Sequence, residues 1–127
     1  MTIIDLDLAD CLSSNEYDPS PHRTDPNEKP VSERMNLPII YSCDKCDYKI
    51  SFGLEDFKKH NKSIFTNLKP DERIIIVQHI IDHQANSFID FYCPKCQQPT
   101  TILFNGGDSG YWGEYFFKID KVLVIKK

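Results

Sequence analysis

Two short motifs constrain the fold of this chain more than any other feature of its sequence. They are Cys43-Asp44-Lys45-Cys46 and Cys93-Pro94-Lys95-Cys96, and each places two thiols three positions apart. At that spacing a tight turn can direct both sulfurs toward one metal ion. Four thiolates in two pairs make a closed tetrahedral ligand set, which suits a structural Zn²⁺. The sequence therefore predicts one structural zinc ion, with the ligands Cys43, Cys46, Cys93 and Cys96.

The expected compartment supports a metal site over disulfides. The chain has 127 residues, 40% of them hydrophobic and 27% charged, which is ordinary for one soluble domain. No apolar run approaches the roughly 18 residues that a membrane span needs. The first residues also lack the basic start and apolar middle of a secretory signal. We therefore expect a cytoplasmic protein with no membrane contact, in which paired cysteines bind metal and Cys11 is a free thiol.

Other uses of the same four cysteines are open. Fe(II) in a rubredoxin-like site would take these ligands, although the chain shows no other electron-transfer feature. A redox-active dithiol explains two symmetrical pairs less well than one shared ion does. Unliganded thiols, or a disulfide between the pairs, complete the alternatives. The pattern favours zinc over all of these.

The histidines do not add a second metal site. His60 follows the first motif as in a two-Cys, two-His finger, but no second His stands about four to six positions later. His79 and His83 would share one helix face, yet Ile80 occupies the position of the catalytic Glu in the His-Glu-x-x-His metalloprotease pattern. We expect His60 at a helix end and the other two on a polar helix face.

Strand patterns flank both cysteine motifs. Residues 39–42 lead into the first motif, and residues 48–52 lead out of it with alternating apolar and polar side chains. Residues 88–92 and 100–104 flank the second motif in the same way. Residues 114–125 supply one bent or two short final strands. Their candidate core residues are Phe116, Ile119, Val122 and Val124.

Helical segments are predicted between the two motifs. Residues 54–60 carry acidic side chains first and basic ones last, the order that complements a helix dipole. Residues 70–86 begin with Pro70 and two acids, which also favours a helix start. The β-branched cluster at 74–77 favours a strand, but the length of the segment favours a helix. The side chains at near-helical spacing are Ile74, Val77, Ile81 and Phe88.

Charge and proline content divide the chain at residue 38. Residues 1–38 contain eight acidic and three basic side chains, for a net charge of −5, and five prolines. We expect an acidic, partly disordered arm there, although residues 3–12 fit either a short strand or a helical turn. Residues 39–127 carry a net charge of +1 and hold nearly all the patterned segments. They form the predicted zinc-stabilised domain.

In residues 39–52 and 88–104 the sequence resembles the zinc-ribbon family, in which two such cysteine turns, each on a β-hairpin, clamp one zinc. An aromatic residue precedes the first Cys of each motif, and a Lys precedes the second. The chain departs from the compact family pattern in the long segment between the turns. The resemblance implies an α+β fold: an antiparallel, zinc-ribbon-like β unit with a helical insertion between the two turns.

A contact surface is expected after the last predicted hairpin. A glycine-rich stretch at 105–110 predicts a loop, and a dense aromatic stretch follows it. A Gly-Asp-Ser-Gly string in this loop is similar to the nucleophile loop of trypsin-like proteases, but the rest of that framework is missing. Interfaces favour aromatic anchors. The candidate partner-binding residues are Asp108, Tyr111, Trp112 and Glu114.

The expected function is binding without catalysis. We expect no enzymatic activity, since no Ser-His-Asp order, phosphate-binding Gly loop or carboxylate pair stands out. In size and acidity the chain is similar to bacterial immunity proteins, which implies a protein partner such as a basic toxin neutralised by occlusion. The alternative is a nucleic-acid-binding zinc ribbon that assists transcription or translation. The nearly neutral body argues against nucleic acid.

Overall fold

The computed structural model describes residues 2–17, 38–60, 67–79, 85–108 and 115–126. Within these ranges the chain is an α+β fold of antiparallel sheets and short helices, as the sequence predicts at that level. None of the helices in the described residues has the length and apolar character needed to cross a membrane.

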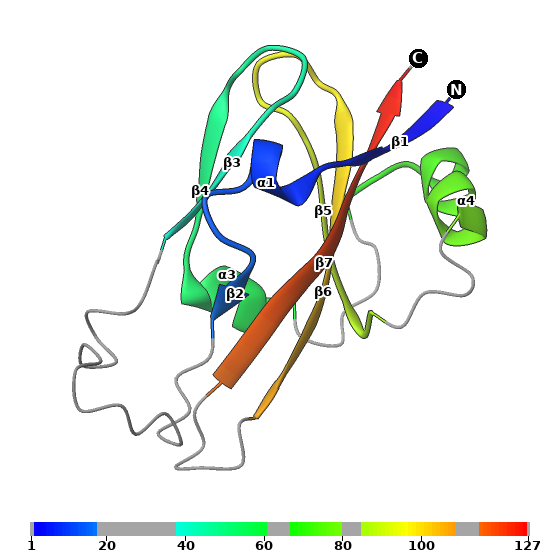
Figure 1. Cartoon of the computed structure of the whole chain (residues 1–127). Helices are drawn as coiled ribbons and strands as arrows, with labels where there is room; N and C mark the ends of the chain where they lie inside the picture. Colours follow the sequence, from blue (N-terminus) through cyan, green and yellow to red (C-terminus); the bar gives the residue numbers. More distant parts are fainter. Residues whose placement is uncertain (1, 18–37, 61–66, 80–84, 109–114, 127) are drawn as a thin grey trace, which may run out of the picture.

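The main sheet is built around one long strand, β7 (Tyr115–Lys126). Strand β6 (Pro99–Asp108) pairs with β7 on one side, and β1 (Thr2–Leu6) pairs with it on the other (Figure 1). Strand β5 (Ser87–Tyr92) extends the sheet beyond β6, and the two-residue β2 (Glu16–Tyr17) also pairs with β7. All these pairings are antiparallel.

A separate two-stranded hairpin carries the first cysteine motif. It consists of β3 (Ile39–Ser42) and β4 (Lys49–Phe52), paired antiparallel as the sequence predicts. The second motif joins β5 to β6 in the main sheet. Both cysteine turns lie at the same end of the molecule (Figure 1). Between the motifs in sequence, the described residues form the helices α3 (Leu54–Lys59) and α4 (Pro70–His79).

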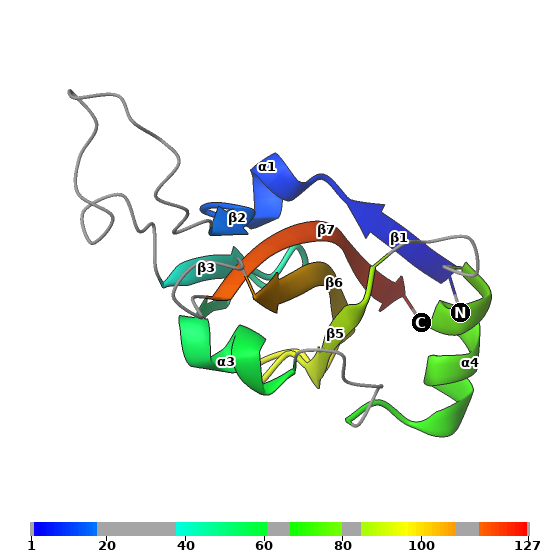
Figure 2. The same ribbon diagram turned by 90° about the horizontal axis from the view of Figure 1, so that it is seen from below.

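Each face of the main sheet has its own core, because side chains alternate between faces along a strand. On the hairpin side, Phe57 of α3 stacks on Phe117 with ring centroids 3.8 Å apart and meets Phe104 edge-on at 5.1 Å. The other face is covered by α4, which Figure 2 shows on the opposite side of the sheet from α1 and β3. Its core consists of Leu68, Ile76, Leu103, Leu123 and Ile125.

Helix α4 differs from its prediction in length and in orientation. The expected helix over 70–86 is described as far as His79; residues 80–84 lie outside the described ranges, and Asn86 is not helical. The near-helical spacing noted in the sequence does not mark the buried face, since Ile74 is 57% and Val77 is 47% exposed. Because four consecutive β-branched residues show no helical period, the pattern could not indicate which of them faces inward. The buried residues of the helix are Glu72 and Ile76.

Hydrogen bonds from β5 explain why α4 buries that face. The carboxylate of Asp90 accepts the backbone N–H groups of Asn67 and Leu68, at 2.7 and 2.8 Å. The carboxylate of Glu72 accepts the backbone N–H of Lys69 and the hydroxyl of Tyr92. These partners position the first helical turn against the strand, which compensates for burying a carboxylate.

The amino-terminal segment is part of the main sheet. Residues 3–12 form both of the expected alternatives in succession, a strand (β1) and the one-turn helix α1 (Leu8–Cys11). Asp7 caps this helix by accepting the backbone N–H of Ala9 at 3.0 Å. The predicted boundary at residue 38 therefore does not separate a free arm from the body for residues 2–17. Residues 18–37 lie outside the described residues.

The glycine-rich stretch is strand rather than loop as far as it is described. Strand β6 continues through residue 108, so the predicted loop at 105–110 is wrong for its first part. Gly106 permits the strand to continue beside β7, because a Cβ at this position would lie 1.8 Å from the hydroxyl oxygen of Tyr115 on β7.

The predicted core residues of β7 are mostly confirmed. Ile119, Val122 and Val124 are buried, whereas Phe116 is only partly buried and the adjacent Phe117 lies in the core instead.

Candidate metal site

The two cysteine motifs form the same backbone turn. In each, the N–H of the first Cys donates to a carbonyl five residues later: Cys43 to Tyr48 at 2.9 Å and Cys93 to Gln98 at 3.0 Å. The N–H four residues after the first Cys donates back to its carbonyl, at 3.0 Å from Asp47 and 2.8 Å from Gln97. These two hydrogen bonds hold each turn in the same closed conformation, which explains why each turn presents both of its sulfurs on one side.

Both turns also share an unusual backbone conformation. Asp47 and Gln97, each directly after the second Cys of its motif, have a positive φ of 62°. A left-handed conformation costs a non-glycine residue about 1–2 kcal/mol. The same strained position in both turns indicates that the turn geometry is required at both ends of the cluster.

The four cysteines converge on one point. All four Sγ atoms lie within 4.8 Å of one another. The closest pairs join the two turns: Cys43 to Cys96 at 3.7 Å and Cys46 to Cys93 at 3.5 Å. These separations exclude disulfides, whose sulfurs are about 2.05 Å apart, and approach the roughly 3.8 Å expected between sulfurs at about 2.3 Å from a tetrahedral zinc. The cluster is compatible with one metal ion, as the sequence predicts.

Burial divides the cluster between inner and outer sulfurs. The first cysteine of each motif, Cys43 or Cys93, is buried, and the second, Cys46 or Cys96, is partly exposed. Burial raises the pKa of Cys43, Cys46 and Cys96. At Cys93 burial is outweighed by the backbone N–H groups of Cys96 and Lys95 and by the Cys46 thiol, which together lower its pKa to about 7. Binding of a cation would release the remaining thiol protons.

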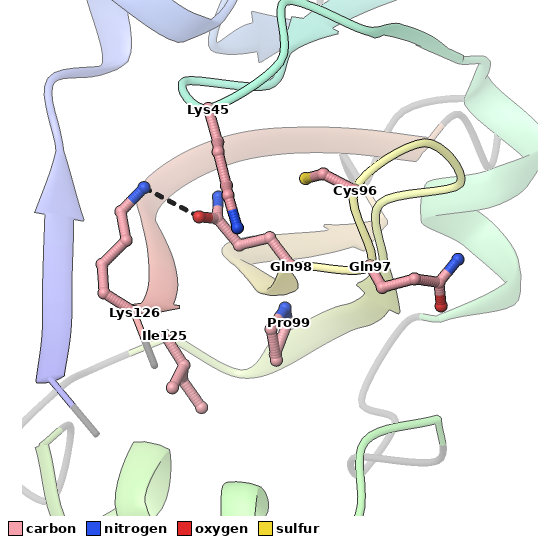
Figure 3. A pocket seen from close by; sticks show the side chains of 7 residues that line it. All are labelled: Lys45, Cys96, Gln97, Gln98, Pro99, Ile125 and Lys126. Atoms are coloured by element: carbon pink, nitrogen blue, oxygen red, sulfur yellow. Dashed lines mark hydrogen bonds between the residues drawn. The ribbon is translucent and has the colours of Figure 1, made fainter.

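A hydrogen-bonded network surrounds the cluster and links three segments of the chain. The side-chain amide of Gln98 donates to Asp44 Oδ1 at 2.6 Å, and its nitrogen lies 4.0 Å from the sulfur of Cys43. The ammonium of Lys126, at the end of β7, donates to Asp44 Oδ2 at 2.6 Å. It also donates to Gln98 Oε1 at 2.7 Å (Figure 3). Both turns are thereby tied to each other and to the last strand.

Sequence reasoning missed this network. Asp44 lies inside the first motif and Gln98 just after the second, but nothing in the spacing pairs them, and Lys126 is distant in sequence. Burial raises the pKa of Asp44, but the hydrogen bonds from Lys126 and Gln98 outweigh it and leave that pKa below its usual value. The carboxylate is therefore charged and fully engaged.

The remaining metal-ligand candidates lie outside the cluster. Among the described residues, only the four paired cysteines come close enough together to share an ion. Cys11 is buried in the core on the hairpin side, where burial raises its pKa to about 11. His60 caps the end of α3, as expected, and His79 is exposed at the end of α4. His83 is not among the described residues.

The structure describes the backbone of only one of the four candidate partner-binding residues. Asp108 is the last residue of β6 and pairs with Tyr115 of β7. Tyr111, Trp112 and Glu114 lie outside the described residues. Their proposed role in partner contact therefore stays a prediction.

Comparison with family models, curated proteins and solved structures found no match for this chain. A function is therefore proposed below from the geometry of the site alone.

Proposed function

We propose that this protein is a non-catalytic binding module of the zinc-ribbon type, in which one structural Zn²⁺ clamps the two cysteine turns. The observation that carries the proposal is the closed set of four sulfurs from two matching turns. Each turn ends a hairpin, β3–β4 or β5–β6, which is the arrangement a zinc ribbon would have. Zinc bound by four thiolates has no open position for a substrate or a reactive water.

Metal analysis tests this clamp. We expect one zinc per chain in the purified protein, and its loss in the double variant Cys93→Ser, Cys96→Ser. The variant Cys11→Ser is the matched control, because it removes a thiol outside the cluster and should retain the metal. Full zinc retention in the double variant would contradict the proposal. Absorption bands of an iron–thiolate centre in the purified protein would identify the bound metal as iron instead of zinc.

We infer that the partner is a protein, best represented by a basic toxin that this chain neutralises by covering it. The support is the charge of residues 1–38, a net −5. Acidic surfaces attract basic partners and speed their association. A pull-down from the native host with the zinc-loaded protein tests this proposal, with the cysteine double variant as control. Recovery of a basic protein is expected; recovery of nucleic acid alone would favour the second candidate.

The second candidate is a nucleic-acid-binding zinc ribbon. One observation favours it: Tyr48 is 41% exposed at the first turn, beside the exposed Lys45 and Lys49. An exposed ring with neighbouring lysines can stack on a base and contact phosphates. Binding of single-stranded DNA or RNA at low salt, declining steeply as salt rises, would support this candidate. Absence of binding at low salt would eliminate it.

A further inference from the structure

A pocket lies next to the metal site and shares one residue, Cys96, with the four-cysteine cluster. Its volume is about 420 Å³, and the first turn, the second turn and the end of β7 all contribute to it. Its lining residues are Lys45, Cys96, Gln97, Gln98, Pro99, Ile125 and Lys126. The hydrogen bonds of Lys126 to Asp44 and Gln98 hold these three segments together around the pocket.

The polar part of the pocket consists of two ammonium groups and an amide that is held in place by hydrogen bonds. None of its lining residues is acidic, and two of them are lysines. In Figure 3 the side chains of Lys45 and Lys126 both extend toward the amide of Gln98. Gln98 is only 4% exposed, and its amide is oriented by Asp44 on one atom and Lys126 on the other. A ligand would therefore meet Lys126 and Gln98 in fixed positions, and little reorganisation of these two side chains would be needed.

Asp44 does not neutralise the whole pocket. Its two carboxylate oxygens are occupied, one by Gln98 and the other by Lys126 at 2.6 Å. This pair accounts for the charge of Lys126, but an ammonium has three protons and two are used by Asp44 and Gln98. The charge of Lys45 has no carboxylate among the lining residues to offset it.

The opposite wall of the pocket is apolar. Pro99 and Ile125, both largely buried, line it beside the polar groups. A site with one apolar wall and a few convergent polar groups is typical of small-ligand recognition. It matches a ligand with a short aliphatic body that ends in an anion.

We propose that this pocket binds a carboxylate of a protein partner, with Lys45 and Lys126 contacting the carboxylate and Pro99 and Ile125 contacting the adjoining aliphatic carbons. A carboxylate accepts charge-assisted hydrogen bonds from two ammonium groups at once. The volume fits a side chain or a chain terminus rather than a folded surface. This goes beyond the clamp function, since it assigns a recognition role to residues that do not bind the metal.

The chain contains a matched control for Lys45. Lys95 holds the same position in the second turn, between the two cysteines, and is also exposed, but it does not line the pocket. If the lysines only balanced the negative charge of a metal–thiolate centre, both would be equivalent. A carboxylate site requires Lys45 and not Lys95.

Titration of the zinc-loaded full chain with small peptides, followed by NMR shifts of the Gln98 side-chain amide, tests the proposal. The probes are acetyl-Leu-Glu-amide, its uncharged counterpart acetyl-Leu-Gln-amide, and N-acetylleucine, which carries an α-carboxylate instead. We expect the uncharged peptide and the variant Lys45→Gln each to weaken binding about tenfold, since a charge-assisted hydrogen bond is lost. Lys95→Gln should change the affinity by less than about twofold, as expected for an exposed charge. The comparison of the two acids identifies a side-chain or a terminal carboxylate as the source.

Several outcomes would overturn the carboxylate site. These are equal binding of the charged and uncharged peptides, equal weakening by Lys45→Gln and Lys95→Gln, and no shift with any acid at millimolar concentration. Shifts with a short oligothymidylate but with none of the acids would assign the pocket to phosphate instead. The zinc content of each variant is measured in parallel, so that loss of the clamp is distinguished from loss of the pocket.

Discussion

The two cysteine turns are alike in their backbone but rest on unlike supports. Each has the same two hydrogen bonds and the same positive φ after its second Cys. The first turn closes β3–β4, a hairpin that pairs with no other named strand. The second closes β5–β6, which continues into β7 and the rest of the main sheet. One turn type therefore serves both a minimal hairpin and a full sheet.

The difference implies a division of labour in stability. A two-stranded hairpin is marginal by itself in water, whereas a sheet of more strands with buried faces is stable. The first hairpin is held by its packing on the main sheet, where Tyr41 and Phe52 contact Phe91 with ring centroids 5.7 and 5.6 Å apart. A metal in the cluster would hold it from the other end. The following predictions test that asymmetry, from the largest expected effect to the smallest.

Metal removal should have the largest effect and should separate the two supports. Structural zinc sites contribute apparent free energies of about 10–16 kcal/mol in small peptides. After chelation we expect amide protection to be lost first in the β3–β4 ladder, at residues such as Tyr41 and Ile50. The β6–β7 ladder, at residues such as Leu103 and Leu123, should retain more protection. Hydrogen exchange measures both, and equal loss in the two ladders would show a single cooperative unit instead.

Removing the ring of Phe57 should be the next largest effect. This side chain is fully buried and stacks on Phe117, so Phe57→Ala should lower the free energy of unfolding by about 3–5 kcal/mol. The control is Phe116→Ala, next to Phe117 in the sequence. It removes a partly buried ring and should lower the free energy of unfolding clearly less. Urea unfolding of the zinc-loaded protein measures both. Equal costs would mean that α3 does not seal the space between the hairpin and the main sheet.

A methyl group at Gly106 should weaken the main sheet, which supports the second turn. The added Cβ would lie 1.8 Å from the hydroxyl oxygen of Tyr115, which donates to the carbonyl of Phe57 at 3.3 Å. We expect Gly106→Ala to cost about 1–3 kcal/mol through overpacking. At Gly107 the nearest atoms of Phe116 are 3.6 Å away, an ordinary contact, so Gly107→Ala is the matched control. Thermal unfolding compares the two, and equal midpoints would contradict the expected clash.

The smallest expected effect comes from replacing the residue with positive φ in each turn, which compares the two turns directly. Asp47→Gly and Gln97→Gly each relieve a left-handed backbone and, by turn geometry alone, should stabilise by a similar amount, about 1 kcal/mol. The flexibility of glycine in the unfolded chain offsets part of that gain. A larger net gain at one turn would show that its support, rather than the turn itself, determines the strain. Opposite signs would contradict the equivalence of the two turns.

The cysteine cluster could be predicted from sequence because its geometry is local. Two residues three positions apart in a tight turn have few ways to place their side chains, so Cys43 and Cys46 could be paired without knowledge of the fold. The hairpin around them followed from alternation in the flanking residues. The Gln98–Asp44–Lys126 network could not be predicted in this way, since it depends on how β7 meets the two turns.

Segments with uniform composition were the least predictable. Residues 74–77 are all apolar and β-branched, so the sequence could not distinguish the buried Ile76 from the exposed Ile74. Glu72 is buried because Tyr92 and the N–H of Lys69 meet its carboxylate, and these contacts arise only from the fold. Gly106 likewise indicated a turn, although its lack of a side chain accommodates Tyr115 within a strand.

The pairing of β1 with β7 has a mechanical consequence. The two strands are antiparallel, and Thr2 lies opposite Lys126. A force that pulls these two residues apart would load their ladder one hydrogen bond at a time, because such bonds run perpendicular to the strands. Strand β1 would therefore peel off at low force, before the ladders between β7, β6 and β5 separate. In an optical trap, a short first extension would precede rupture of the metal-clamped remainder.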